Sequence, residues 1–202
     1  MVSLVVGIAG GTASGKSTIA RGVAASLGDE CLLIAHDRYY HSMPEELRGF
    51  PKRFNFDHPD ALDTDRLVSD LSALLVGQPV RLPDYDYATH LSIEGDEEVG
   101  RRRVILVEGI LVLHYPGLRR ILDHAVFVEA PDDIRLARRI RRDVQHRQRR
   151  VEEILDQYEH SVRPMHEAFV RGTRVLADLV LDGTADIDSN VERVLDLPGV
   201  RS

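Results

Sequence analysis

The chain has 202 residues, of which 43% are hydrophobic and 29% charged, with a formal net charge of −7. This length and composition predict a single globular domain spanning residues 1–202. The acidic balance argues against a protein that binds nucleic acid over its whole surface, and the single cysteine, Cys31, excludes an internal disulfide. No apolar run reaches the roughly 18 residues that a membrane span needs, and no basic segment precedes the first apolar stretch as in a signal peptide. We therefore expect a cytoplasmic protein without nucleic-acid or membrane partners.

The first predicted elements are a strand at 4–9 and a helix at 16–27, joined by the segment GGTASGKS at 10–17. This segment matches G-x-x-x-x-G-K-[ST], the pattern of a phosphate-binding loop. In such a loop, backbone N–H groups and the positive end of the following helix surround a phosphate. Lys16 would contact the β- and γ-phosphates, and the Ser17 hydroxyl would bind Mg²⁺. The predicted nucleotide-binding residues here are Gly10, Gly11, Thr12, Ala13, Ser14, Gly15, Lys16, Ser17 and Thr18.

The rest of the chain alternates short apolar strands with amphipathic helices. Strands are predicted at 31–35, 103–107, 125–128 and 178–181, helices at 64–76, 132–146, 151–170 and 186–197, and an exposed hairpin at about 80–99. Residues 41–63 are polar and irregular. The alternation predicts the α/β fold of a P-loop NTPase, with a parallel sheet of about five strands covered by helices on both faces.

Two carboxylates follow predicted strands, at the sheet edge where ligands bind in such folds. Asp37 comes just after the strand at 31–35, where it could act as a general base or bind Mg²⁺ through water. Glu108 ends the strand at 103–107, where an acidic residue often completes the Mg²⁺ coordination shell.

The segment from Asp132 to Arg150 contains eight arginines. It could be a solvated helix face, a nucleic-acid patch, or a lid at about 138–158 that closes over a triphosphate. The excess of positive charge is local and the chain is acidic as a whole, so we favour the lid.

Aromatic side chains gather near a second acidic position. Tyr85, Tyr87, His90 and Phe56 could stack on a planar base, and His90 could hydrogen-bond to its edge. Asp37 and Asp57 would repel a phosphorylated acceptor, but they suit the hydroxyls of a neutral polyol. Apart from Lys16, the only lysine is Lys52, and no Asn/Thr-Lys-x-Asp guanine-reading motif contains it. His and carboxylates do not recur at the spacing of a structural zinc site.

Several motifs together resemble the uridine kinase (uridine–cytidine kinase) family of P-loop kinases. They are GGTASGKS (10–17), DRYY (37–40), NFDHPDALD (55–63), YDY with a following His (85–90), EGIL (108–111) and RRIRRD (138–143). The resemblance implies transfer of the γ-phosphoryl group of ATP or GTP to the 5′-hydroxyl of uridine or cytidine, with Mg²⁺ as cofactor. It also implies a homo-oligomer, commonly a tetramer, inhibited by pyrimidine triphosphates.

The resemblance assigns a role to each matching position. Asp37 would be the catalytic base, and Asp57 and Arg139 would hold the ribose hydroxyls. The residues expected around the pyrimidine are Tyr40, Phe56, Tyr85, Tyr87, His90 and Gln157. The lid arginines that contact the donor would be Arg142, Arg147 and Arg149.

Three positions depart from the family pattern. Gln148 stands where the lid usually has glycine, which could stiffen the lid; Ser92 and Asp182 stand where arginines are usual. The missing arginine near the nucleotide leaves the choice of phosphate donor open. Two other classes also remain: a kinase of another polyol, phosphoribulokinase-like or pantothenate-kinase-like, and a nucleotide-dependent RNA-binding module that uses the arginine-rich segment.

Overall fold

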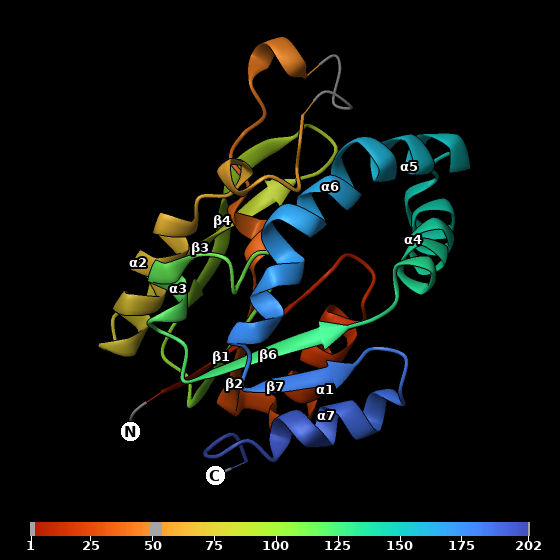
Figure 1. The fold of residues 1–202 in the computed structure, drawn as a ribbon. Helices are drawn as coiled ribbons and strands as arrows, with labels where there is room; N and C mark the ends of the chain where they lie inside the picture. The colour runs from red at the N-terminus through yellow and green to blue at the C-terminus, as the bar shows by residue number, and fades with distance from the viewer. Residues whose placement is uncertain (1–2, 49–53, 202) are drawn as a thin grey trace.

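The computed structural model describes residues 3–48 and 54–201, and its centre is a parallel sheet of five strands (Figure 1). The strands are β1 (Leu4–Gly10), β2 (Cys31–Ala35), β5 (Val104–Glu108), β6 (His124–Glu129) and β7 (Leu179–Asp182). Their order across the sheet is β2-β5-β1-β6-β7, and every neighbouring pair is parallel. The predicted sheet is thus confirmed.

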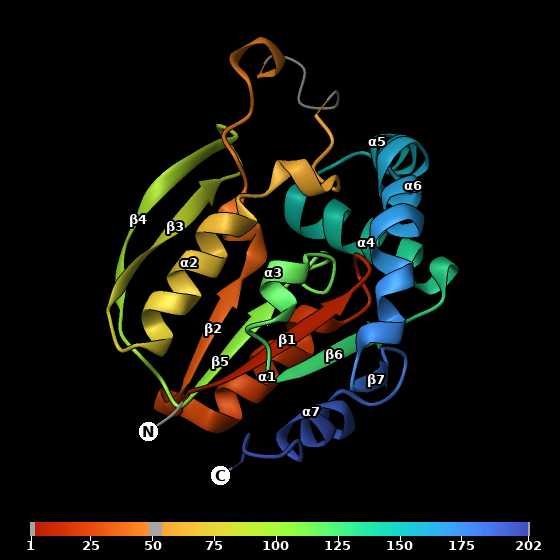
Figure 2. The ribbon, with the colours of Figure 1, turned by 60° about the vertical axis from the view of Figure 1, so that its left-hand side comes forward.

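Helices cover both faces of this sheet (Figure 2). The helices are α1 (Lys16–Leu27), α2 (Thr64–Leu75), α3 (Pro116–Arg119), α4 (Asp132–Arg147), α5 (Val151–Gln157), α6 (Arg163–Met165) and α7 (Ile187–Leu195). Val6 and Ile8 of β1 face the apolar cluster that contains α1 and α7. Val5 and Ala9 of β1 face the cluster that contains α2 and α3. Because both faces are buried, β1 and the first four residues of β5 carry no charged side chain, as is usual for parallel strands.

The hairpin predicted at 80–99 is formed by β3 (Val80–Asp86) and β4 (Leu91–Val99). It stands beside α2 at the edge of the molecule (Figure 2). One face is not exposed as predicted, because Val80, Leu82 and Tyr85 are buried in the same cluster as the leucines of α2. The hairpin therefore forms a wall that extends the core toward the irregular segment after β2.

The long helix predicted at 151–170 is less regular than its apolar pattern indicated. The structure has α5, a π-helical turn at Tyr158–Val162, α6, a second π-helical turn at His166–Val170, and a 3₁₀ segment at Arg171–Leu176. Pro164 lies in α6, and proline removes one backbone donor from the helical ladder. We attribute the wider turns to the need to re-pair carbonyl groups around it.

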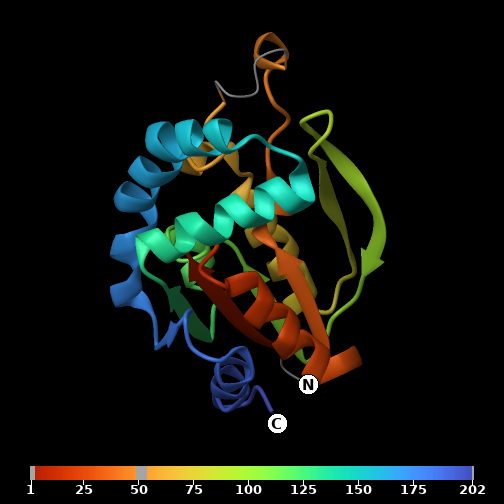
Figure 3. The same ribbon diagram turned by 90° about the vertical axis from the view of Figure 1, so that its right-hand side faces the viewer.

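The carboxyl-terminal ends of β1, β2 and β5 lie at the same edge of the sheet. The phosphate-binding loop follows β1, a 3₁₀ turn at His36–Tyr39 follows β2, and Glu108 ends β5. Helix α4 lies across this edge (Figure 3). Among the described residues, no helix is both long and apolar enough to span a membrane.

Candidate active site

The loop after β1 turns its backbone tightly just before α1. Gly15 has φ 106° and precedes α1, and its carbonyl accepts hydrogen bonds from the N–H groups of Thr18 and Ile19. Gly10 has φ 149°, and a Cβ there would lie 2.4 Å from the carbonyl oxygen of Val128. Only glycine tolerates both the backbone angle and the crowding at this point. The loop therefore has the geometry of an anion-binding nest at the start of a helix.

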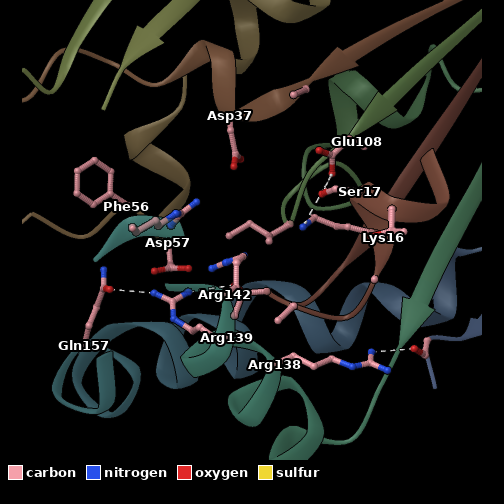
Figure 4. A pocket seen from close by; sticks show the side chains of 18 of the residues that line it. Lys16, Ser17, Asp37, Phe56, Asp57, Glu108, Arg138, Arg139, Arg142 and Gln157 are labelled. Atoms are coloured by element: carbon pink, nitrogen blue, oxygen red, sulfur yellow. Dashed lines mark hydrogen bonds and ion pairs between the residues drawn. The ribbon is translucent and has the colours of Figure 1, made fainter. Parts of the chain in front are cut away.

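This loop forms one wall of an open cavity of about 1540 Å³ (Figure 4). Most predicted site residues line it: Thr12, Ala13, Gly15, Lys16, Ser17, Thr18, Asp37, Tyr40, Phe56, Asp57, Tyr87, His90, Glu108, Arg139, Arg142, Arg147, Arg149 and Gln157. Residues that are more than 140 positions apart in the chain thus share one space.

Four predicted residues are near the cavity without lining it. Gly10, Gly11 and Ser14 form the buried back of the loop, and the position of a Gly11 Cβ is occupied by the guanidinium of Arg135. Tyr85 is buried behind the wall, with its ring 5.3 Å from that of Tyr40 and 5.2 Å from that of Tyr87. Their contacts with ligands stay predictions. Lys52 lies outside the described residues.

Asp37 points into the cavity from the turn after β2 (Figure 4). Burial raises the pKa of its carboxyl group to about 6, and the carboxylates of Glu108 and Asp57 add to this rise while Lys16 opposes it. Asp57 lies on the other side of the space, and burial raises its pKa too, against the charges of Arg139 and Lys16. A carboxylate whose pKa lies near neutrality is suited to accept a proton from a bound hydroxyl.

Ser17, Lys16 and Glu108 form a polar corner between α1 and β5. The Ser17 hydroxyl donates to Glu108 Oε2 at 3.0 Å, and Lys16 Nζ lies 3.9 Å from the same oxygen. No group of three or more His, Cys, Asp or Glu able to hold a metal by themselves occurs in the part of the chain described here. One hydroxyl and one carboxylate do fit Mg²⁺, which usually completes its shell with water and substrate phosphates.

Aromatic rings make the wall opposite the phosphate-binding loop. The ring of Phe56 lies 5.6 Å from that of Tyr40 and 5.5 Å from that of His90. His90 has φ 59°, and its ring is half-buried, with a buried Nδ1 that has no hydrogen-bond partner among the described residues. Buried polar atoms nearly always have a hydrogen-bond partner. This nitrogen is therefore a ready contact for a polar group of a ligand.

Arginines of α4 and of the turn after it enter the cavity from the side of the lid. Arg139 Nη1 donates to the Thr12 hydroxyl at 3.0 Å, and Nη2 donates to Gln157 Oε1 at 2.9 Å. Arg149 Nη1 donates to the same Gln157 oxygen at 2.8 Å. Gln157 thus connects both arginines to α5, and Arg139 connects the lid to the phosphate-binding loop.

Gln148 ends α4 in the left-handed region, with φ 52° and ψ 31°. Its N–H donates to the carbonyl of Asp143, and so does the N–H of Arg149 at 3.1 Å. The chain therefore turns back here in the conformation that glycine adopts most readily. This backbone conformation is a physical reason for the glycine that the resemblance leads one to expect here. Glutamine in the same conformation implies local strain.

We expect Gln148→Gly to raise the melting temperature by about 2–4 °C, because a non-glycine residue in the left-handed region costs on the order of 1 kcal/mol. Gln145→Gly is the matched control, since Gln145 is an exposed residue inside the same helix and glycine should destabilise there. Differential scanning calorimetry of both variants would show shifts of opposite sign. A lower melting temperature for Gln148→Gly would contradict the strain.

Comparison with known proteins adds to this geometry. The model of the phosphoribulokinase/uridine kinase family matches residues 5–189. A uridine kinase from Chloroflexus aggregans (strain MD-66 / DSM 9485) is 47% identical over 184 residues, which cover 89% of this chain and 87% of that protein. The chain belongs to the phosphoribulokinase/uridine kinase family. A uridine kinase from Clostridium perfringens (strain SM101 / Type A), another relative, is 39% identical over 87% of this chain and 85% of its own length.

Solved structures agree with the fold of this family. Phosphoribulokinase from Rhodobacter spheroides superposes with a TM-score of 0.61 at 12% identity, covering 91% of this chain and 73% of that chain. At this level of identity the similarity concerns the fold alone.

Several residues of the site were missed as site residues by the sequence analysis. Arg138 lines the cavity and donates to the carbonyl of Gly183 at 2.8 Å, and Asp186 and Asn190 at the start of α7 line it as well. Asp182, one of the departures from the family pattern, does not line the cavity but accepts hydrogen bonds from Thr184 in the turn after β7. The start of α7 carried no motif, so nothing in the sequence distinguished it from an ordinary surface helix.

Proposed function

We propose that this protein transfers the γ-phosphoryl group of ATP or GTP to the 5′-hydroxyl of uridine or cytidine. The observation that carries the proposal is the position of Asp37, whose carboxyl group faces the cavity between the phosphate-binding loop and the aromatic wall. The names of the relatives, which are uridine kinases, support the same substrate class. The product would be the nucleoside monophosphate of a salvage reaction.

The acceptor side of the cavity suits a nucleoside. Asp57 and Arg139 would hold the ribose hydroxyls, because a carboxylate accepts and a guanidinium donates hydrogen bonds. Phe56, Tyr40 and Tyr87 offer ring faces and edges to the pyrimidine, and Nδ1 of His90 offers it a polar contact. Gln157 would help to fix Arg139 on this side.

The donor side combines the loop with the arginines of the lid. The residues expected to bind the triphosphate are the backbone and side chains of 10–18 together with Arg142, Arg147 and Arg149. Ser17 and Glu108 would hold Mg²⁺, which would supply positive charge that offsets the charge of the donor phosphates. Positive groups aimed at the transferring phosphoryl stabilise the charge that develops there.

Proton transfer would be the task of Asp37. Its ionised carboxylate takes the proton of the 5′-hydroxyl as that oxygen forms a bond to the γ-phosphorus and the bond to the β-phosphate oxygen breaks. Asp37 and Asp57 are both half-buried and line the cavity on the acceptor side. Two carboxylates there disfavour an acceptor that already carries a phosphate, such as the substrate of a phosphoribulokinase.

A panel of acceptors with both donors tests the proposal. Uridine, cytidine, adenosine, pantothenate and ribulose 5-phosphate would each be incubated with Mg·ATP or Mg·GTP, and products separated by ion-exchange chromatography. We expect uridine or cytidine monophosphate as the main product. Phosphorylation of another acceptor, with no reaction of uridine or cytidine, would refute the assignment.

Homo-tetramer formation and a cytoplasmic location stay predictions.

The pH dependence of turnover should follow Asp37. Because the base must be ionised, we expect kcat/KM for the nucleoside to be constant above the pKa of about 6 and to fall roughly tenfold per pH unit below it. The monophosphate should be measured directly between pH 5 and 8.5, because the activity of coupling enzymes also depends on pH. Activity that stays flat down to pH 5 would exclude Asp37, with this pKa, as the base.

A further inference from the structure

We propose that Asp143 is a positioning residue. Its carboxylate holds the guanidinium groups of the lid arginines in fixed positions around the site of the donor phosphates. This inference rests on the proposed function, because it concerns the same phosphoryl-transfer site. Asp143 does not line the cavity, so it would act through the guanidinium groups and not on the substrate. Its role is distinct from that of the carboxylates that face the cavity.

The carboxylate of Asp143 lies at the centre of four arginines. Arg142 Nε donates to Oδ1 at 2.8 Å, and Arg147 Nη1 lies 3.6 Å from the same oxygen. Arg149 Nη1 donates to Oδ2 at 3.4 Å, and Arg139 Nε lies 3.8 Å from it. Both carboxylate oxygens are therefore shared between arginines, and all four of these arginines line the cavity.

Burial separates Asp143 from the other acidic residues of α4. Its side chain is 0% exposed, whereas that of Asp132, which pairs with Arg135 and Arg171, is 43% exposed. Burial raises the pKa of Asp143, but the hydrogen bond from Arg142 and the neighbouring arginine charges outweigh it and lower the pKa below its usual range. A buried carboxylate is tolerated only when it is paired in this way.

The charges of this cluster are unequal. One carboxylate faces four guanidinium groups, so it restrains them without neutralising them. The surplus of positive charge on Arg142, Arg147 and Arg149 remains available to a triphosphate. Without Asp143, the four like charges would repel one another and the long side chains would spread into solvent.

The backbone of Asp143 supports the same arrangement. Its carbonyl accepts the N–H groups of Gln148 and Arg149, which turns the chain back after α4. This turn brings Arg149 alongside Arg139, so that both guanidiniums reach the side-chain oxygen of Gln157. Backbone and side chain of one residue thus fix the positions of arginines from the helix and from the turn.

A double-mutant cycle with Asp143→Asn and Arg142→Gln tests this role. We expect Asp143→Asn alone to lower kcat by about 100-fold, the order of loss that a misplaced catalytic group causes. In the Arg142→Gln background, the same change should cost much less, because part of what Asp143 positions is already gone. Asp133→Asn is the matched control, since Asp133 is an exposed aspartate on the same helix, and it should change kcat less than twofold.

Equal fold-losses in both backgrounds would show a merely structural role and overturn the proposal, as would a loss no larger than that of Asp133→Asn. Should Asp143→Asn fail to fold, Asp143→Glu takes its place in the same cycle. A loss of kcat of about tenfold that becomes smaller in the Arg142→Gln background supports the proposal. A loss of kcat that is absent, or equal in both backgrounds, overturns it. The Kd of Mg·ATP is measured across the cycle by calorimetry. Non-additive Kd values would support the role of Asp143 even if no nucleoside were phosphorylated and the proposed function failed.

Discussion

Replacing Asp37 by asparagine is expected to lower kcat for the nucleoside by about 10²–10⁴-fold, the usual contribution of a positioned general base. Asparagine has the same shape but cannot take the proton of the 5′-hydroxyl. Binding of Mg·ATP should be nearly unchanged, because the phosphates are held by the loop and the lid. Single-turnover kinetics and calorimetry would measure the two quantities separately.

Asp29→Asn is the control for this change, since Asp29 is an exposed aspartate that does not line the cavity.

The pH dependence of protein stability supplies a second check on Asp37. Folding raises the pKa of Asp37 to about 6, so ionised Asp37 destabilises the folded state, and stability is lost as pH rises from about 4 to 6. Asp37→Asn should therefore melt higher than the wild type at pH 8. Near-normal turnover by the variant would remove Asp37 as the base.

Replacing Lys16 is the second change with a large expected effect. Lys16→Met should lower kcat by about 10²–10³-fold, as the loss of one charge-stabilising donor does in other enzymes, and it should also weaken Mg·ATP binding. Lys16→Arg should fail to restore turnover, because a planar guanidinium does not fit where a compact ammonium lies between phosphates. Arg81→Met, at an exposed position of the hairpin, is the control.

A further consequence separates Lys16 from a residue that only supports the fold. The charge of Lys16 lowers the pKa of Asp37. Its removal should therefore move the acidic limb of the pH profile to higher pH in Lys16→Met, while Lys16→Arg should leave the limb near its original position. An unchanged limb in both variants would mean that the two side chains are not coupled.

Local patterns were sufficient for the parts of this protein that depend on neighbouring residues in the chain. The phosphate-binding loop is contiguous, and its glycines, Lys16 and Ser17 must follow one another for the backbone to surround an anion. Asp37 and Glu108 could be placed as well, because the ends of parallel strands meet at one edge of a sheet. The five strands were predicted within one or two residues because each is a short apolar run in the sequence.

Contacts between distant segments could not be predicted in this way. Arg135, Arg139 and Asp143 are spaced four residues apart on α4 and are all buried, although nothing apolar marks that face. Burial of such a charged face depends on partners that come from elsewhere, such as Thr12 and Gln157. Tyr85 shows the reverse case, because its position beside Tyr87 predicted a ligand contact, and its side chain is packed in the apolar core and does not line the cavity.

The sequence by itself determined the phosphate-binding loop, the parallel sheet and the two carboxylates at the strand ends, since each follows from a short motif or from a regular apolar pattern. Only the tertiary structure decided that Arg138 also reaches the cavity, that Asp143 is buried among the arginines, and that Asp186 and Asn190 at the start of α7 line the same cavity. The physical reason is that charged side chains become buried only where distant residues supply their partners, and no local pattern records those partners.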